Sequence, residues 1–422
     1  MLQISRLVAV VLCSVTVATT GACQSQTDVE LLESTWRLVA DRHYDTELHG
    51  LDWPGIGEKY RVLIEASGSR AESLEIIDRM LQELGDSHCI VGELKDAASV
   101  SSPYIFGAAD PGIDLRLVAG EALVTRVKPG SSAARAGIQT GFVITAIDGA
   151  PVGEMADSVS QRPPFTPSNE LFFRVQALLW ALYGDPGTLV SVRYIDGQGL
   201  EGEATLERAD RGNGQELFPG FPPVFLEYSN RALPGGVQYL SFNAFQPDTP
   251  QTLIDMIESS DRNAPMILDL RGNNGGSATA TLELLARFSP RRQLVYHRQS
   301  REQSEAVYVE PADYIHQGAV VILVDELSVS AAENFAGIMQ KSGLATVIGQ
   351  RTPGQLLWGE GFPLGDDVMA LIPVAEIIYP DGTSLEGVGV TPNREIELNR
   401  DSLLNGVDTQ LQAAVELLTN SF

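Results

Sequence analysis

Residues 323 to 337 read Leu323-Val-Asp-Glu-Leu-Ser-Val-Ser330-Ala-Ala-Glu333-Asn-Phe-Ala-Gly337. The run begins with apolar residues typical of a strand and ends with apolar residues at helical spacing, and two serines lie between them. A hydroxyl between a strand end and a helix N-terminus is close to backbone N–H groups and to the positive end of the helix dipole, which favour an oxyanion. Ser330 is therefore a candidate nucleophile. Ser330 and Glu333 also fit a capping box, in which the serine would only cap the helix.

A second apolar strand, earlier in the chain, ends in a glycine-rich loop. It reads Met266-Ile-Leu-Asp-Leu-Arg-Gly-Asn-Asn-Gly-Gly276. If the two strands lie side by side in one sheet, their ends bring the amides of Gly275 and Gly276 next to Ser330. Glycine-rich loops also bind phosphate, but the chain has no Gly-x-x-x-x-Gly-Lys, so a phosphate site is not expected.

Four segments of the chain together resemble a known family. They are Asp269-Leu-Arg-Gly-Asn-Asn-Gly-Gly276, Ser330-Ala-Ala-Glu333, Ala345-Thr-Val-Ile-Gly-Gln-Arg-Thr-Pro-Gly354 and Gly382-Thr-Ser-Leu-Glu386-Gly-Val-Gly-Val-Thr-Pro392. Their order and spacing are similar to those of the C-terminal-processing (tail-specific) proteases. The segment Leu84-Gly-Asp-Ser-His88 and a PDZ-like stretch extend the resemblance over most of the chain. The resemblance implies a serine peptidase with an α/β layered, ClpP/crotonase-like core.

One position departs from the family pattern. Tail-specific proteases typically use a Ser–Lys dyad, and the position of that lysine is Gln355 here, which cannot act as a base. The tricorn-type branch of the superfamily instead uses a Ser–His pair supported by Ser and Glu. The resemblance therefore implies Ser330 as nucleophile, His88 as base, and Ser87 and Glu386 as its supports. The Gly275, Gly276 and Ala331 amides are then expected to form the oxyanion hole.

The chemistry of these residue types agrees with that set. A serine hydroxyl needs an adjacent base, and the base needs a third group that fixes its tautomer. Histidine, with an ordinary pKa near 6.5, suits this work near pH 7. Cys89 adjoins His88, but neighbouring residues seldom point at each other, so we interpret Cys89 as a buried apolar residue. Neither a metal nor a cofactor is expected.

Residues 1–22 predict an export signal. A basic Arg6 precedes the apolar run Leu7–Ala18, which is too short to span a membrane. Thr20-Gly-Ala-Cys23 resembles a bacterial lipobox, so we expect a lipid anchor on Cys23 and a place in the cell envelope, at the outer membrane or periplasm in a Gram-negative host. The alternative is ordinary secretion with a free cysteine.

Length and charge limit the organisation and the partners. A chain of 422 residues should divide into two or three domains, and its net charge of −26 argues against binding nucleic acid or anionic lipid. We expect a multi-domain α/β (α+β) fold. Its parts are the signal peptide 1–22, an N-terminal helical domain 28–102, a PDZ-like β domain 103–208 and an α/β serine peptidase domain 215–422.

The PDZ-like domain is expected to bind peptides. Its most specific segment is Ala122–Ile138, whereas Asp114 and the Pro-rich insertion 162–167 depart from the pattern. PDZ domains add an extended peptide as a strand, so Ile113, Leu115 and Leu117 are the expected peptide-binding residues.

The C-terminal half alternates strands with helices, which predicts a layered α/β domain with its ligands at strand C-terminal ends. The predicted strands are 236–242, 265–270, 319–325 and 345–348, and the predicted helices are 249–260, 277–288, 330–342 and 408–418. We predict an exported serine peptidase acting on proteins or peptides. Because relatives such as the interphotoreceptor retinoid-binding proteins keep the fold but bind apolar ligands, an inactive member that binds peptides or apolar ligands is the alternative that Gln355 leaves open.

Overall fold

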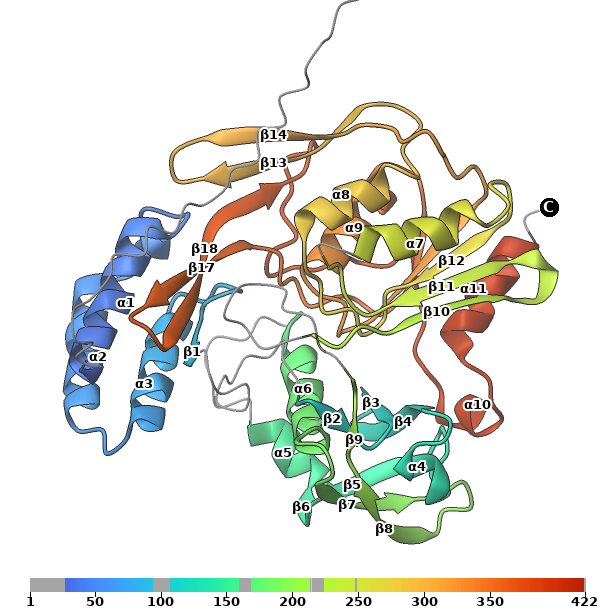
Figure 1. The fold of residues 1–422 in the computed structure, drawn as a ribbon, viewed down its shortest axis with the longest axis horizontal. Coiled ribbons are helices and arrows are strands. Elements are labelled where there is room, and N and C mark those ends of the chain that lie inside the picture. Colours follow the sequence, from blue (N-terminus) through green and yellow to red (C-terminus); the bar gives the residue numbers. More distant parts are fainter. Residues whose placement is uncertain are drawn as a thin grey trace, which may run out of the picture.

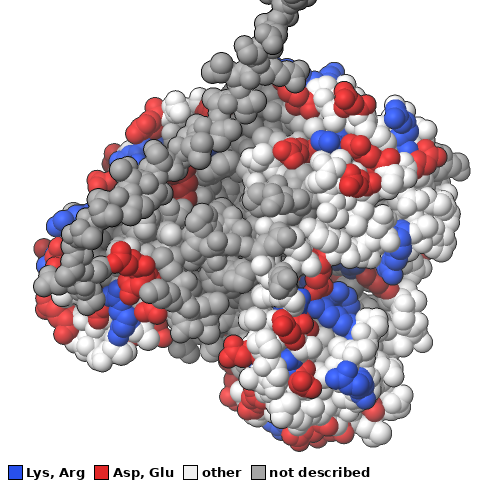
Figure 2. All heavy atoms as spheres, viewed as in Figure 1, with Lys and Arg blue, Asp and Glu red and all other residues white. Residues whose placement is uncertain are grey.

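The computed structural model describes residues 27–93, 107–158, 168–212, 214, 224–246 and 249–420. Figure 1 shows N-terminal helices on one side, a small β domain below and an α/β core on the other side. The predicted signal peptide, Cys23 and the insertion 162–167 lie outside the described residues. Within those residues, no helix combines the length and the apolar character that crossing a bilayer requires. Acidic and basic side chains are interspersed over the described part of the face in Figure 2.

The N-terminal region is helical, as the sequence predicts, and ends in a short strand. Its elements are α1 (Asp28–Arg42), the 3-10 turn η1 (Leu48–Gly50), α2 (Trp53–Glu65), α3 (Arg70–Gln82) and the strand β1 (Ile90–Glu93). Thr27 forms a capping box with Glu30 at the start of α1, and the Ser69 side chain caps α3. These helices share one apolar core with Val368 and Ile372 from the far end of the chain.

A five-stranded sheet joins this N-terminal region to the C-terminal part. Its strands are β1, β13 (Gln293–Ser300), β14 (Ser304–Val309), β17 (Trp358–Leu364) and β18 (Val368–Ile378). β1 pairs antiparallel with β18, with Ile90 opposite Leu371. This pairing brings the loop before β1 to the C-terminal domain.

The central sheet has the order β10-β11-β12-β15-β16-β19, and all neighbours after β10 run parallel. Its strands are β10 (Tyr228–Ala232), β11 (Gln238–Phe242), β12 (Met266–Asp269), β15 (Val320–Val324), β16 (Thr346–Gly349) and β19 (Arg394–Glu395). The helices are α7 (Thr249–Glu258), α8 (Ala278–Leu285), α9 (Ala331–Lys341) and α11 (Thr409–Thr419). The predicted strands and helices of this domain coincide with these elements to within a few residues at each end.

Both faces of the central sheet are buried, which explains the continuous apolar runs of its strands. Leu268 and Ile322 pack toward α7, α8 and α9, and Ile267 and Val321 pack toward α11 on the opposite face. The helices lie on the two sides of the sheet in Figure 1. The last helix, α11, therefore packs onto this domain.

The β domain has the strand order β3-β4-β5-β7-β8, with the α6 helix packed against β3. Its elements are β2 (Ala109–Asp110), β3 (Ile113–Val118), β4 (Glu121–Val127), α4 (Ser132–Arg135), β5 (Val143–Ile147), β6 (Ala150–Pro151), α5 (Val152–Ser158), α6 (Glu170–Leu182), β7 (Leu189–Ile195), β8 (Glu201–Glu207) and β9 (Ala209–Asp210). Two residues of the turn before α9, Leu327 and Val329, are buried in its core. The short helix α10 (Arg400–Leu404) also contacts it through Leu404.

Candidate active site

Ser330 lies in the turn between β15 and α9, at the carboxyl end of the central sheet. Its backbone is left-handed, with φ 55°, an uncommon conformation for a residue with a side chain. The turn is bound to the neighbouring glycine-rich loop: the Val329 amide donates to the Asn273 carbonyl (2.9 Å), and Ser328 Oγ donates to the Leu270 carbonyl (2.7 Å). The two strand ends therefore meet as the sequence predicts.

Gly275 packs directly against Ser330. A Cβ on Gly275 would lie 2.7 Å from Ser330 Cβ and 2.7 Å from the Val329 carbonyl oxygen, and its φ is +79°. Only glycine fits this position without displacing the nucleophile. Gly276 is equally confined, because its Cβ would lie 2.0 Å from the Phe245 carbonyl oxygen.

His88 approaches Ser330 from a remote part of the chain. Gly85, with φ 75°, follows α3, and His88 lies in the loop before β1 with φ 60°. His88 Nε2 lies 3.2 Å from Ser330 Oγ, although 242 residues separate the two in sequence. The distance suits proton transfer from the hydroxyl to the ring.

Ser87 and Glu386 extend this contact into a chain of four residues. Ser87 Oγ lies 2.8 Å from His88 Nδ1, and it donates to Glu386 Oε2 at 3.0 Å. The Ser87 hydroxyl has one hydrogen, and the carboxylate receives it, so the ring must carry a hydrogen on Nδ1 and donate it to Ser87. Nε2 is then unprotonated and faces the Ser330 hydroxyl.

Glu386 is partly buried and surrounded by donors. Besides Ser87, the amides of Leu356 (2.6 Å) and Leu357 (3.1 Å) donate to its Oε2. Burial raises the pKa of Glu386 to about 8, and the hydrogen bonds from Leu356 and Ser87 act in the opposite direction because they favour the carboxylate. Carboxylates near a turn are usually solvated, whereas these donors enclose Glu386.

Burial also changes the titration expected for the base. Desolvation lowers the pKa of His88 from 6.5 to about 4, since a charged imidazolium is disfavoured in this partly buried position. The sequence-based expectation of an ordinary pKa near 6.5 is therefore wrong for the substrate-free protein. Cys89 is buried as expected, and burial raises the pKa of its thiol well above the usual value, so it is no nucleophile.

Glu333 accepts hydrogen bonds from the segment 352–355 as well as from the helix N-terminus that a capping box involves. The Ser330 amide donates to it (3.1 Å), and it also accepts from Thr352 Oγ1 (2.5 Å), the Gly354 amide (2.7 Å) and the Gln355 amide (2.8 Å). Burial raises its pKa to about 7. Glu333 and Glu386 thus fix consecutive parts of the segment 352–357, one beside the nucleophile and the other beside the base.

The expected oxyanion donors differ in their environment. The Gly275 amide donates to Asn273 Oδ1 at 2.9 Å, so an oxyanion would have to compete with this side chain, and its place in the oxyanion hole stays a prediction. Within the described part of the chain, the amides of Gly276 and Ala331 donate to no backbone carbonyl. Ala331 directly follows Ser330, and Gly276 directly follows Gly275, which packs against Ser330.

None of the described lysines takes the place of the dyad lysine that Gln355 replaces. Gln355 is buried, and its amide binds Glu333. The described lysines form ion pairs with carboxylates outside the catalytic group: Lys59 with Glu83, Lys128 with Asp110 and Glu227, and Lys341 with Asp381.

The expected peptide-binding side chains do not face a ligand. Ile113, Leu115 and Leu117 are buried in the core of the β domain. β3 is nevertheless an edge strand of its sheet, so its backbone, rather than these side chains, is the element that a peptide could extend. Arg116, which alternates with them, reaches out and donates to Asp325 Oδ2 in the turn before Ser330 (2.7 Å).

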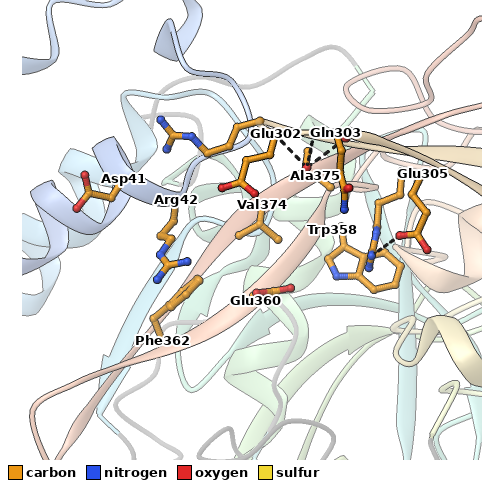
Figure 3. A pocket seen from close by; sticks show the side chains of 13 residues that line it. Asp41, Arg42, Glu302, Gln303, Glu305, Trp358, Glu360, Phe362, Val374 and Ala375 are labelled. Atoms are coloured by element: carbon orange, nitrogen blue, oxygen red, sulfur yellow. Dashed lines mark hydrogen bonds and ion pairs between the residues drawn. The ribbon is translucent and has the colours of Figure 1, made fainter. Parts of the chain in front are cut away.

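A cavity of about 180 Å³ lies near the base but belongs to the opposite face of β17. Figure 3 shows that Trp358, Glu360 and Phe362 line it together with Arg42 from the end of α1. Gly359, between the first two, faces His88, because a Cβ on it would lie 3.1 Å from His88 Cβ. Successive residues of a strand point to opposite faces, so this cavity is separate from the catalytic group.

Three family models match the chain. Residues 236–396 match peptidase family S41, residues 29–82 match the Tricorn protease C1 domain, and residues 123–161 match a PDZ domain. The helical region, the β domain and the α/β core described above therefore each have a known counterpart.

Relatives and solved structures agree with these matches. A carboxyl-terminal-processing protease of Synechocystis sp. is 24% identical over 401 residues, which cover 92% of this chain and 86% of the relative. The photosystem II D1 C-terminal processing protease superposes with a TM-score of 0.58 at 19% identity, covering 93% of this chain and 97% of its own. The tricorn protease gives a TM-score of 0.52 at 18% identity over 94% of this chain, but only 37% of tricorn is covered.

Proposed function

Because this chain is a serine peptidase that resembles the carboxyl-terminal-processing proteases and carries an S41 peptidase domain, we propose that it cleaves protein or peptide substrates with Ser330 as nucleophile and His88 as base. The observation that carries the proposal is the hydrogen-bonded chain from Glu386 through Ser87 and His88 to Ser330. A glutamine stands where the lysine of a Ser–Lys dyad would be, and this chain of contacts supplies another base.

The proposed reaction forms an acyl-enzyme. Ser330 Oγ attacks the peptide carbonyl carbon while its proton passes to His88 Nε2, and the amides of Gly276 and Ala331 donate to the oxyanion. His88 then gives the proton to the leaving amine, and the C–N bond breaks. A water molecule, deprotonated by His88, attacks the ester and releases Ser330. Ser87 and Glu386 hold the ring in the tautomer that can accept the proton.

Labelling with a fluorophosphonate probe, together with hydrolysis of a peptide library, tests this proposal. Wild type should react with the probe at Ser330, and Ser330→Ala and His88→Ala should abolish both labelling and hydrolysis while circular dichroism stays unchanged. Gln355→Ala should retain most of the activity, because its side chain has no assigned step. Hydrolysis that survives His88→Ala would refute the Ser–His–Glu assignment, and an unlabelled, inactive wild type would favour the ligand-binding alternative.

We also propose that the chain is exported and anchored to the cell envelope through Cys23. The apolar run Leu7–Ala18 and the lipobox-like Thr20-Gly-Ala-Cys23 support this. Intact-mass measurement of the membrane fraction should find a mature chain that begins at an acylated Cys23. An unmodified N-terminus at another residue would remove the anchor and leave only secretion.

The PDZ domain is proposed to capture substrate through the backbone edge of β3. This uses the strand position predicted from the sequence without the side-chain contacts of Ile113, Leu115 and Leu117. Titration of the full-length Ser330→Ala variant with C-terminal peptides should give saturable binding. Binding that is absent at millimolar peptide would make the domain a cover for the active site instead.

A further inference from the structure

Two histidines and an aspartate converge beside the loop that carries the proposed base. His43 follows α1, His49 lies in η1, and Asp86 immediately precedes Ser87. His43 Nε2 and His49 Nε2 lie 2.7 Å and 2.8 Å from the same atom, Asp86 Oδ2. One ligand atom from each residue lies within 4.8 Å of the other two.

His49 has a carboxylate oxygen at each ring nitrogen. Asp45 Oδ2 lies 3.2 Å from its Nδ1, and Asp86 Oδ2 lies 2.8 Å from its Nε2. Only the contact of Nε2 with Asp86 has hydrogen-bond geometry, and the contact of Nδ1 with Asp45 is an ion-pair distance. A neutral imidazole has one N–H, and a ring that carries it on Nδ1 leaves Nε2 unprotonated.

The surroundings favour a metal ion between the ring and Asp86. If His49 Nδ1–H donates to Asp45, its Nε2 lone pair points to Asp86. Nδ1 of His43 lies 3.1 Å from the Asp45 carbonyl oxygen, to which it can donate, and 3.2 Å from the Asp45 amide, from which it can accept in the other tautomer. A carboxylate or carbonyl that holds the outer nitrogen is the usual partner of a metal-binding histidine.

We propose that His43, His49 and Asp86 bind one divalent transition-metal ion of the zinc class. Two imidazole nitrogens and one carboxylate oxygen are a donor set typical of Zn²⁺ with an open fourth position. Ligand atoms around a tetrahedral zinc lie about 3.3 Å apart. Asp86 must therefore move away from both rings by about 0.5 Å, and the two imidazole nitrogens, which are up to 4.8 Å apart, must approach each other by up to about 1.5 Å. The His43 side chain is fully buried, whereas the His49 side chain is 37% exposed, which gives the ion access from solvent and room for a water ligand.

The ion would connect three segments of the N-terminal region. It joins the end of α1, the η1 turn and the loop 85–88, and the last of these supplies Ser87 and His88. His49 and His88 both have left-handed backbones, with φ 57° and 60°, so each is held in a conformation that needs support from its surroundings. The metal site therefore positions the base loop and takes no part in the reaction. Its binding of metal does not depend on the proposed function.

Metal binding is tested on the full-length Ser330→Ala variant after removal of metals with EDTA. Calorimetric titration with ZnCl₂ should give one ion per chain with micromolar or tighter affinity, and CoCl₂ should give the visible absorption bands of low-coordinate cobalt. Saturation with zinc should raise Tm by about 3 °C or more, because the ion binds the folded chain.

Histidine variants decide whether the observed ion occupies this site. His49→Ala should weaken zinc binding at least about tenfold and abolish the cobalt spectrum, since a ligand is lost. His297→Ala, a partly exposed histidine of β13, is the matched control and should bind zinc as before. His49 is partly exposed, so its variant should keep the wild-type circular dichroism even if His43→Ala does not fold.

Two outcomes would overturn the proposal. If zinc binds equally well to the His49→Ala variant, the ion is adventitious and binds elsewhere. If wild type binds neither zinc nor cobalt at 100 µM, the cluster is a hydrogen-bonded network that holds no metal ion. Neither outcome bears on hydrolysis, which is measured separately on wild type.

Discussion

Glu386 accepts two hydrogen bonds from Ser87, one from its amide and one from its hydroxyl, each at 3.0 Å. The pair joins residues separated by 299 positions, and it fixes the direction of the Ser87 hydroxyl. That direction determines which nitrogen of His88 is protonated. The relationship is therefore a means of setting the tautomer of the base, with a serine between the carboxylate and the ring.

Replacing Glu386 tests this role. In Glu386→Gln an amide N–H₂ can donate to Ser87, which releases the serine hydrogen toward His88 Nδ1 and favours the wrong tautomer. We expect kcat/KM to fall about 100-fold or more, with KM little changed, because an inverted tautomer has a large effect in the Ser-His-Asp enzymes. Steady-state kinetics with a cleavable peptide provides the measurement.

Glu395→Gln is the matched control, since Glu395 is an exposed glutamate of β19. It should leave kcat/KM within twofold of wild type, about the scatter of such measurements. Ser87→Ala should lower kcat/KM as Glu386→Gln does, because it removes the hydroxyl that connects Glu386 with His88. If Glu386→Gln kept full activity, Glu386 would have only a structural part in holding Leu356 and Leu357.

The pH dependence of hydrolysis reports the buried state of His88. Its pKa is lowered to about 4, so the ring stays neutral and can accept a proton well below pH 6.5. The acid limb of kcat/KM should therefore have its midpoint clearly below 6.5. The unfolded chain takes up this proton near pH 6.5, so the stability of the folded state falls as the pH decreases between these two values.

Circular dichroism at each pH separates loss of the base from unfolding. Activity lost between pH 5 and 4 while the fold persists would agree with the prediction. A midpoint at or above 6.5 in a folded protein would show that His88 is solvated in the working enzyme, as after an opening of the site by substrate.

Glu386 predicts a second step at higher pH. Burial raises the pKa of Glu386 to about 8. A protonated Glu386 could donate to the Ser87 hydroxyl, whereas the ionised carboxylate can only accept the Ser87 hydrogen. kcat/KM should rise further as the pH increases through about 8, and the rise should disappear in Glu386→Gln. A wild-type profile that is flat from pH 6 to 9 would mean that the donors from Leu356, Leu357 and Ser87 keep Glu386 ionised throughout.

The sequence predicts the parts of the site that depend on local pattern and on the family resemblance. Strands of continuous apolar residues and the turn at Ser330 are visible without a structure. The alternation along Ile113-Asp-Leu-Arg-Leu117 also indicates that the side chains of Ile113, Leu115 and Leu117 are buried and do not bind a peptide. Three apolar residues at period two mark the buried face of a strand, and Arg116 between them points the other way.

Other features depend on long-range contacts that a pattern cannot reveal. β17 contains Gly359, Gly361 and Pro363, which weaken the strand signal, and it forms only because β18 pairs along its whole length. Glu333 reads as a helix cap because its other partners, in the segment 352–355, come from a different part of the chain. His43, His49 and Asp86 have no motif spacing, and only the fold brings them together.

Gly275 provides a steric test of the nucleophile turn. In Gly275→Ala the new Cβ would lie 2.7 Å from Ser330 Cβ at a φ of +79°, so Ser330 must move away from His88. We expect a loss of kcat/KM of about 100-fold or more, since displacements of about 1 Å have such effects. Gly343→Ala is the control: Gly343 also has a positive φ (+68°), but nothing lies within 4 Å of its Cβ. Equal losses in both variants would assign the effect to backbone strain alone.

The contact of Arg116 with Asp325 predicts that the PDZ domain stabilises the turn that carries Ser330. Its guanidinium donates to Asp325 Oδ2 (2.7 Å), and the other oxygen of Asp325 accepts from the amides of Gly272 (2.9 Å) and Leu327 (3.0 Å). Arg116→Ala would leave a buried carboxylate without its cation, which costs about 3–5 kcal/mol when one partner of such a pair is removed. We expect a loss of that size in the free energy of unfolding in urea, together with a fall in kcat/KM of about tenfold or more as the turn shifts.

Arg126→Ala supplies the comparison, because Arg126 lies in the same domain as Arg116 and pairs with Asp114 and with Glu227 of the peptidase domain, but its side chain is 53% exposed. Exposed pairs contribute about 0–1 kcal/mol, so this variant should remain close to wild type in stability and activity. Arg116→Lys retains a positive charge next to Asp325 and should recover part of what Arg116→Ala loses. Suppose that Arg116→Ala and Arg126→Ala had the same free energy of unfolding and the same kcat/KM. The PDZ domain could then move without disturbing Ser330. The contact at Asp325 would then be a consequence of docking rather than a support of the active site.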